Sequence, residues 1–320
     1  MLLRELKAIY FNTVNFAFFR QVFCHVMCHV ENVRVCCHSL KYAIKVLKAT
    51  AQAAAMRYNN RKYLRKITML GIIGGTGLAQ LENLNITRRQ IARTPYGEAS
   101  QPLVFGELAG QQVVFLARHG AGHTIPPHAV NYRANIWALH AVGVRSLLAI
   151  ATVGGISNDL APGAIVLPHQ MIDYTHGRKN TYHDGVELPV KHIDFTEPYS
   201  VNLRQICKDA ALNIGQSLRD GGIYACVQGP RLETAAEINR LERDGASLVG
   251  MTGMPEAVLA RELGLHYAAL CPVANHAAGR GDSKQGIKFE DLMGKLELTM
   301  QQVRALTAEV ANLYGQTNGH

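Results

Sequence analysis

From residue 69 onward, short apolar runs alternate with segments of helical periodicity, and this alternation is the feature that most limits the fold. The runs are apolar throughout, which is typical of strands covered on both faces. The segments between them, such as Val130 to Val142 and Thr234 to Asp244, carry apolar residues at helical spacing. We therefore predict a single α/β domain over residues 69–320, with a largely buried central sheet flanked by helices and Phe289 to Tyr314 as an outer closing helix.

Residues 1–68 differ from the rest of the chain in charge. They hold 12 Lys and Arg against 2 Asp and Glu, whereas the other 252 residues hold 21 against 22. The formal net charge of +9 therefore belongs to this segment, which we predict to be an extension outside the fold, with Met56 or Met69 as the natural start. Because the body is neutral, no nucleic-acid partner is expected for it, and an RNA-binding basic tail stays an alternative of another class.

Metal, membrane and disulfide interpretations of the extension are weak. In Cys24 to His29, "CHVMCH" has two types of metal ligand, but no second ligand pair follows at zinc-finger spacing. The apolar stretch before Arg20 is too short to span a bilayer, and Ser is scarce for a transit peptide. The seven cysteines are an odd number and scattered, which favours a reducing compartment. We expect a cytoplasmic protein with no metal and no membrane partner.

Each apolar run ends in a cluster of glycine with polar residues. In open α/β sheets, ligands bind beyond the carboxyl ends of the strands, so these clusters should converge on one site. The first, "GIIGGTGLAQL" (Gly71 to Leu81), resembles a phosphate-binding turn. It lacks the third glycine of a dinucleotide fingerprint and the Lys of a Walker loop. A corner whose glycines serve only geometry remains the alternative.

Arg118 and His119 follow the run "QVVFLA" and therefore stand at a strand end. A guanidinium is permanently charged and binds two oxygens of a phosphate at once, and an adjacent imidazole can add one donor. The pair indicates an oxyanion site, supported by hydroxyl groups at other strand ends. An ordinary surface pair is the alternative when the two residues are considered alone.

Several long motifs together resemble one family, the trimeric branch of the methylthioadenosine phosphorylases and purine nucleoside phosphorylases. The resemblance covers Met69 to about Thr307 and implies a mixed sheet, a homotrimer and phosphorolysis of a nucleoside. Inorganic phosphate would then be a co-substrate, and no metal, nicotinamide or flavin is required. The motifs are "GIIGGTGL", "ARHG", "HTIPPHAVNYRANIWAL", "TVGGISNDLAPGAIVLPHQMIDYT", "GPRLETAAE" and "VGMTGMPEAVLARELGL".

The same resemblance implies where the substrates bind. Met251 would lie under the ribose, and Asn275, His276 and Ala277 would contact the nucleoside; a core position is the alternative for Met251. The segment His176 to His183 is a candidate contribution from a neighbouring subunit. The implied phosphate site consists of Thr76, Arg118, His119, Ala151, Thr152 and Thr252, with Ala151 contributing only its backbone.

The resemblance implies that two residues contact the purine base. Glu233 matches the glutamate with which 6-oxopurine phosphorylases accept N1–H, where methylthioadenosine phosphorylases have a serine. Asn275 matches the asparagine that bonds N7 and O6, where 6-aminopurine enzymes have an aspartate. A 6-oxopurine presents an N1–H donor and an O6 acceptor, which a carboxylate and an amide complement. Considered alone, Glu233 could instead complement a helix dipole, and Asn275 could form a turn.

The sugar end is less specific. Ile287 falls near the position where ordinary purine nucleoside phosphorylases hold the 5′-OH with a histidine, so the sequence favours an apolar 5′ pocket and S-methyl-5′-thioinosine as substrate. The products would be hypoxanthine and 5-methylthioribose 1-phosphate. The alternatives are a broad inosine and guanosine phosphorylase, a methylthioadenosine phosphorylase, and a catalytically silent nucleoside- or anion-binding protein.

Overall fold

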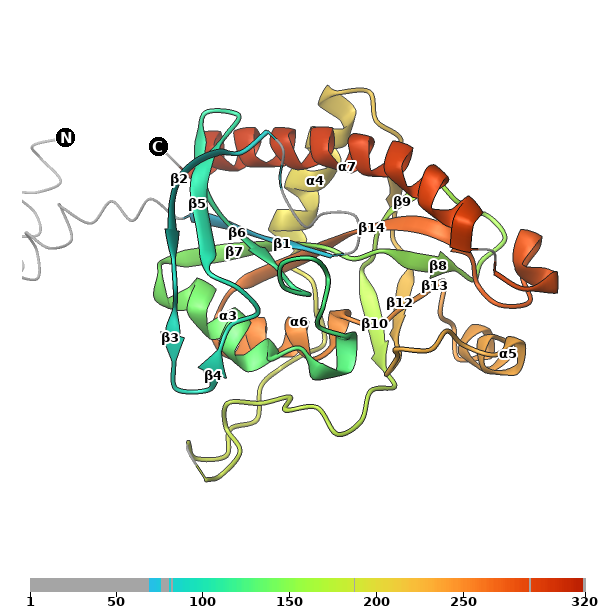
Figure 1. Cartoon of the computed structure of the whole chain (residues 1–320), viewed down its shortest axis with the longest axis horizontal. Helices are drawn as coiled ribbons and strands as arrows, with labels where there is room; N and C mark the ends of the chain where they lie inside the picture. Colours follow the sequence, from blue (N-terminus) through green and yellow to red (C-terminus); the bar gives the residue numbers. More distant parts are fainter. Residues whose placement is uncertain (1–68, 76–80, 82, 187, 288, 319–320) are drawn as a thin grey trace, which may run out of the picture. The chain divides into compact units, whose positions relative to one another are not determined.

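A mixed sheet forms the centre of the molecule, and a separate two-stranded ribbon lies beside it (Figure 1). The strands of the sheet are β1 (Met69–Gly74), β2 (Asn85–Gln90), β5 (Leu103–Leu108), β6 (Gln111–Ala117), β7 (Val144–Ile150), β8 (Val153–Gly155), β9 (Ile165–Leu167), β10 (Gln170–Asp173), β11 (Arg219–Asp220), β12 (Ile223–Cys226), β13 (Leu248–Gly250) and β14 (His266–His276). The ribbon pairs β3 (Arg93–Thr94) with β4 (Gly97–Glu98). The order across the sheet is β10-β12-β13-β8-β14-β7-β1-β6-β5-β2, with β9 between β14 and β11.

This computed structural model describes residues 69–75, 81, 83–186, 188–287 and 289–318, without the side chains of 289–295 and 318. The predicted extension over residues 1–68 and the predicted phosphate ligand Thr76 lie outside the described residues. Within them, the prediction of a mixed, largely buried sheet is confirmed. The pairs β1–β6, β1–β7, β7–β14 and β12–β13 are parallel, whereas β5–β6, β2–β5 and β8–β13 are antiparallel.

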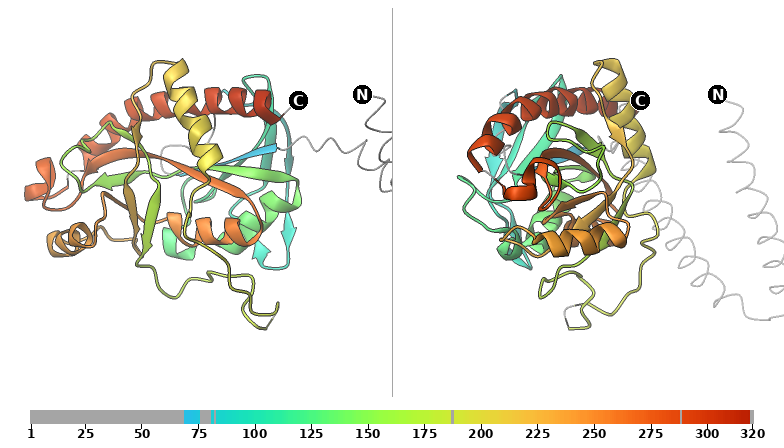
Figure 2. Two further views of the ribbon diagram at one scale, coloured as in Figure 1. Left: turned by 180° about the vertical axis from the view of Figure 1, so that it is seen from behind. Right: turned by 90° about the vertical axis from the view of Figure 1, so that its right-hand side faces the viewer.

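Helices cover both faces of the sheet (Figure 2). On one face α3 (Tyr132–Ala141) packs against α6 (Gly253–Glu262), and on the other α4 (Val201–Asn213) packs against α7 (Phe289–Asn318). The shorter α5 (Ala235–Arg243) joins a third apolar cluster at the β12–β13 end. Two 3₁₀ turns, Pro127–Ala129 and Gly281–Gln285, complete the elements. No helix in the described part of the chain is both long and apolar enough to cross a membrane.

Side-chain caps set where the two predicted inner helices begin. The Asn131 side chain accepts the Ala134 N–H at the start of α3. Thr234 and Glu237 form a reciprocal capping box at the start of α5. Glu233 therefore precedes the cap of α5, and Glu237 occupies the first turn where the dipole argument had placed Glu233. Glu233 instead lines the cavity described below.

The closing helix is confirmed and ends at Asn318, four residues beyond the predicted end. Its buried side chains recur every three or four residues, which turns one stripe of the helix toward the sheet. These residues are Leu296, Met300, Val303, Leu306, Val310 and Tyr314.

Candidate active site

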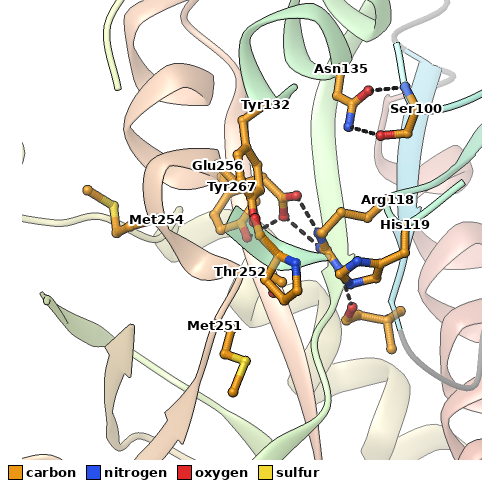
Figure 3. A network of polar contacts seen from close by, with 12 residues as sticks. Ser100, Arg118, His119, Tyr132, Asn135, Met251, Thr252, Met254, Glu256 and Tyr267 are labelled. Atoms are coloured by element: carbon orange, nitrogen blue, oxygen red, sulfur yellow. Dashed lines mark hydrogen bonds and ion pairs between the residues drawn. The ribbon is translucent and has the colours of Figure 1, made fainter. Parts of the chain in front are cut away.

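A cavity of about 490 Å³ opens at the carboxyl ends of the central strands. Adjacent parallel strands deliver their following residues to the same edge, which is why segments far apart in sequence meet here. Most of the predicted site residues described by the structure line this cavity: Arg118, His119, Ala151, Thr152, Glu233, Met251, Thr252 and Asn275. Figure 3 shows Arg118, His119 and Thr252 gathered at one end of the network, with Met251 further along.

The Arg118 guanidinium is held by a buried carboxylate on helix α6. Nε and Nη2 donate to the two oxygens of Glu256 at 2.6 and 2.7 Å, and Nη1 donates to the Ile150 carbonyl at 3.0 Å. The Tyr267 hydroxyl donates to the same carboxylate at 2.9 Å. Arg118 and Glu256 are 1% and 0% exposed. This network is drawn in Figure 3.

The pairing fixes both the charge and the direction of Arg118. Burial works to lower its pKa, but the charge and hydrogen bonds of Glu256 outweigh burial and raise the pKa above its already high usual value. Three of the five guanidinium N–H bonds go to Glu256 and Ile150, and within the described residues two remain. Since Arg118 lines the cavity, these two N–H bonds can bind two oxygens of a phosphate.

His119 is held in one tautomer. Its Nδ1 lies 2.8 Å from the Ile125 carbonyl, which can only accept, so Nδ1 carries the hydrogen and Nε2 carries a lone pair in the neutral ring. Burial, the charge of Arg118 and the neighbouring His123 lower its pKa to about 4. We expected the imidazole to add a donor. In this geometry, Nε2 of the neutral ring can accept a hydrogen, and it can donate only after it gains a proton.

The remaining residues of the oxyanion end are contributed by three strand ends. A Cβ on Gly75 would lie 2.6 Å from the Ile150 carbonyl and 2.9 Å from Nη1 of Arg118, so the glycine is required for close packing on the guanidinium. Thr252 is 8% exposed, and its N–H donates to the Tyr224 hydroxyl. The Ala151 N–H, expected to reach phosphate, is already donated to the Leu270 carbonyl, because Ala151 still pairs with β14.

Glu233 also lines the cavity. Its side chain is half-buried, and loss of water raises the pKa of the carboxyl above its usual value. A hydrogen bond from its own backbone works against this rise, the charge of Glu237 adds to it, and Arg231 opposes it. The carboxylate can therefore accept a hydrogen from a bound base, and it takes up a proton more readily than an exposed glutamate.

Asn275 lines the cavity from the end of β14. Its Nδ2 donates to the His276 carbonyl at 2.6 Å, and the Ser283 hydroxyl donates to the same carbonyl at 2.6 Å. Within the described residues, the Asn275 oxygen and one of its N–H bonds remain for a base. The His276 ring itself lies under the backbone of Gly281, where an added Cβ would be 2.5 Å from it.

Three predicted contacts, His276, Ala277 and Ile287, are not among the described residues that line the cavity. Ala277 is 1% exposed and belongs to the α5 cluster, where its N–H donates to the Gly155 carbonyl. Ile287 is half-buried and, like His276 and Ala277, is absent from the described residues that line the cavity. Across the described residues, no three His, Cys, Asp or Glu side chains are grouped so as to hold a metal ion.

The sequence analysis missed Glu256 and Tyr267, which orient Arg118. Glu256 is 138 residues from its partner in sequence, so no local pattern joins them. A signal was nevertheless present, because a lone glutamate within the apolar stretch "GMPEAVLA" is exceptional for a buried helix. A charged residue on the inner face of a helix requires a partner of opposite charge.

The fold and the cavity define a class: an α/β protein in which an oriented guanidinium, a carboxylate and an amide line one cavity at the strand ends. The family comparison agrees, since the model of the phosphorylase superfamily matches residues 69–312. The chain belongs to the phosphorylase superfamily.

Individual relatives are also similar over most of their length. A Pseudomonas syringae protein named "Probable S-methyl-5'-thioinosine phosphorylase" is 50% identical over 244 residues, which are 74% of this chain and 98% of the relative. The "6-oxopurine nucleoside phosphorylase" of Pyrococcus furiosus is 44% identical over 220 residues, covering 67% and 82%. Among solved structures, the methylthioadenosine phosphorylase of Schistosoma mansoni in complex with adenine is 31% identical with a TM-score of 0.74, covering 78% and 92%.

Proposed function

We propose that the protein is a pentosyltransferase that cleaves 6-oxopurine nucleosides with phosphate, and that its preferred nucleoside is S-methyl-5′-thioinosine. The observation that carries this proposal is that Arg118, Glu233 and Asn275 line the same cavity. The guanidinium suits an oxyanion, and the carboxylate with the amide complements N1–H, O6 and N7 of a 6-oxopurine. The names of the Pseudomonas syringae and Pyrococcus furiosus relatives support it.

The proposed reaction follows from the guanidinium and the amide that line the cavity. Phosphate held by Arg118 attacks C1′ as the bond to the purine breaks, and its charge stabilises the cationic sugar in the transition state. Negative charge that develops on the leaving base is met by Asn275 near N7. No resident metal or organic cofactor enters this scheme.

The nucleoside specificity has one strong alternative, a broad inosine and guanosine phosphorylase. Ile287, on which the apolar 5′ pocket depends, does not line the described cavity, so the chain's own contacts do not decide between the two sugars. The methylthioinosine preference therefore depends on the relatives that carry this name. A methylthioadenosine phosphorylase is disfavoured because Glu233, when ionised, would face the N1 lone pair of adenine.

The test is phosphate-dependent release of free base, measured by chromatography with methylthioinosine, inosine and methylthioadenosine. EDTA is present throughout, so that the assay also tests independence of metal ions. We expect hypoxanthine from methylthioinosine at the highest kcat/KM. A higher kcat/KM with inosine would make the broad phosphorylase the better assignment, and adenine as the main product would contradict the base assignment. Release from none of them would leave a silent binding protein.

We also propose a cytoplasmic homotrimer that acts in purine salvage. The segment between β10 and α4 extends away from the body (Figure 1) and exposes Val186 and Val190 by 90% and 67%. Apolar side chains exposed in this way fit contact with another subunit. Arg178, in the His176 to His183 stretch of this segment, bonds within its own chain. Sedimentation of the pure protein at three times the chain mass, rather than as a monomer, would support the trimer.

A further inference from the structure

The molecule contains a second arginine that the phosphorolysis scheme leaves unexplained, Arg178. It lies in the segment that follows β10, yet its guanidinium reaches inward between two loops. Nη1 donates to the carbonyls of Met251 and Met254 at 2.8 and 2.6 Å. Nη2 donates to the carbonyls of Val227 and Gln228 at 3.3 and 2.8 Å. One side chain thus joins the loop after β13 to the loop after β12.

Both loops line the cavity. The loop after β12 leads through Pro230 to Glu233, and the loop after β13 contains Met251, the candidate ribose contact, and Thr252, a candidate phosphate contact. The strands themselves pair only as far as Cys226 and Gly250, so the backbone carbonyls beyond them have left the sheet. Arg178 supplies donors to four of these carbonyls.

The same guanidinium is also linked, through Tyr132, to a third segment that lines the cavity. Nη1 donates to the Tyr132 hydroxyl at 3.3 Å, and that hydroxyl donates to the Pro127 carbonyl at 3.0 Å. Pro127 lines the cavity in the segment that follows His119. The Arg178 guanidinium carbon also lies 5.5 Å from the centre of the Tyr132 ring.

Arg178 cannot act on the substrate directly, because its donors are already used. Nε donates to the Gln228 side chain at 3.1 Å, so five N–H bonds serve six described acceptors. The two loops it joins are packed tightly, since a Cβ on Gly229 would lie 2.5 Å from Sδ of Met251. A displacement of one loop would therefore be passed to the other.

We propose that Arg178 is a positioning residue that fixes Met251 and the Glu233 loop in register, so that the ribose and the base are held at the right distance from the phosphate. This inference rests on the proposed phosphorolysis. Arg178 bonds the loop that contains Met251 and the loop that leads to Glu233. Arg118 is held separately, by Glu256 and Ile150, and Tyr267 bonds the same Glu256 carboxylate. Lysine has three donors and no planar fork, and so cannot replace it fully.

The test compares Arg178→Met and Arg178→Lys with Arg240→Met as the matched control. Arg240 also lies over a tyrosine, 5.3 Å from the Tyr174 ring, but is mostly exposed and joins no cavity loops. For Arg178→Met we expect about 10²-fold lower kcat/KM for the nucleoside, because a small misplacement of bound groups has that effect. The KM for the nucleoside should rise more than the KM for phosphate, because Arg178 bonds both the Met251 loop and the loop that leads to Glu233. Arg178→Lys should recover part of the loss, and Arg240→Met should match wild type.

A second readout needs no substrate and separates this proposal from the proposed function. Hydrogen–deuterium exchange in peptides covering 227–234 and 251–256 should be about tenfold faster in Arg178→Met, with β7 as the unchanged reference. Guanidinium at about 20 mM, far below denaturing concentrations, should reverse part of both effects. Unchanged exchange in both loops, or an equal rise in the KM for phosphate and for nucleoside, would overturn the proposal. A wild-type protein without phosphorolysis would instead contradict the proposed function.

Discussion

Replacing either Arg118 or Glu256 alone by methionine is expected to destabilise the protein by about 3–5 kcal/mol, because each change leaves an uncompensated buried charge. Both side chains are almost completely buried, and they share two hydrogen bonds at 2.6 and 2.7 Å. Replacing both together should destabilise the protein less than either single change. Apolar side chains of similar volume often substitute for a buried ion pair without loss of stability.

The measurement is a double-mutant cycle from urea unfolding. The exposed pair Arg219 and Asp159, with Nε and Oδ2 2.9 Å apart, is the control, and its replacement by methionines should change the free energy of unfolding by less than about 1 kcal/mol. Adding Tyr267→Phe to the double variant should restore further stability, since the hydroxyl would otherwise lose its carboxylate partner. Additive effects of Arg118→Met and Glu256→Met would contradict the coupling.

The same double variant separates stability from catalysis. It should fold, yet its kcat/KM for phosphorolysis should fall by about 10³-fold, because the charged donors aimed at phosphate are gone. Wild-type activity in a folded double variant would show that Arg118 does not hold the phosphate. Glu256→Met should also lose activity. If added phosphate raises its melting temperature, the anion has supplied the negative charge beside Arg118 that Glu256 no longer provides.

The sequence predicts where the site lies better than it predicts which residues hold the site in place. Arg118, Thr252 and Asn275 follow apolar runs, and such runs become strands whose carboxyl ends meet, so their convergence could be predicted without a structure. Glu256 and Arg178 could not be placed in this way. Glu256 pairs with Arg118, 138 residues away, and Arg178 bonds residues 46 to 76 positions away, so both depend on how helices and loops pack on the sheet.

The structure was also needed to see which hydrogen-bond donors of the site are already used within the protein. The Ala151 N–H goes to Leu270, and Nδ1 of His119 goes to Ile125, so the donors that a sequence pattern assigns to phosphate are partly used within the protein. The alternative for Glu233, a place in the first turn of α5 beside the helix dipole, is wrong, because the capping box at Thr234 starts the helix at Ala235. The assignment of Glu233 and Asn275 to the base came from family resemblance, since neither spacing nor composition identifies a purine.

The double change Glu233→Ser and Asn275→Asp is expected to reverse the base preference. In the wild-type cavity, a 6-aminopurine places its N1 lone pair against a carboxylate and its amino group near an amide. After the change, the aspartate can accept from the amino group, and a 6-oxopurine leaves polar groups unpaired. Each unpaired buried group has an effect of about 1–3 kcal/mol, so the ratio of kcat/KM for adenine to hypoxanthine nucleosides should rise at least about 10²-fold.

The pH dependence gives a second, independent measure of Glu233. Burial raises the pKa of its carboxyl, so as pH falls it gains a proton at a higher pH than an exposed glutamate does. The protonated acid donates to the N1 lone pair of a 6-aminopurine and no longer accepts N1–H. The wild-type ratio of aminopurine to oxopurine cleavage should therefore rise as pH falls. Ionisation of phosphate affects both substrates alike and cancels in the ratio.

Two controls make this prediction specific. Glu233→Ser alone should abolish the pH trend of the ratio, because the titrating group has been removed. Glu237→Gln keeps the capping box of α5 but removes a negative charge that helps to raise the Glu233 pKa, so the trend should persist and move to lower pH. A trend that persists in Glu233→Ser, or discrimination that is unaltered in the double variant, would mean that another residue recognises the base and that the carboxylate end of the cavity has a different role.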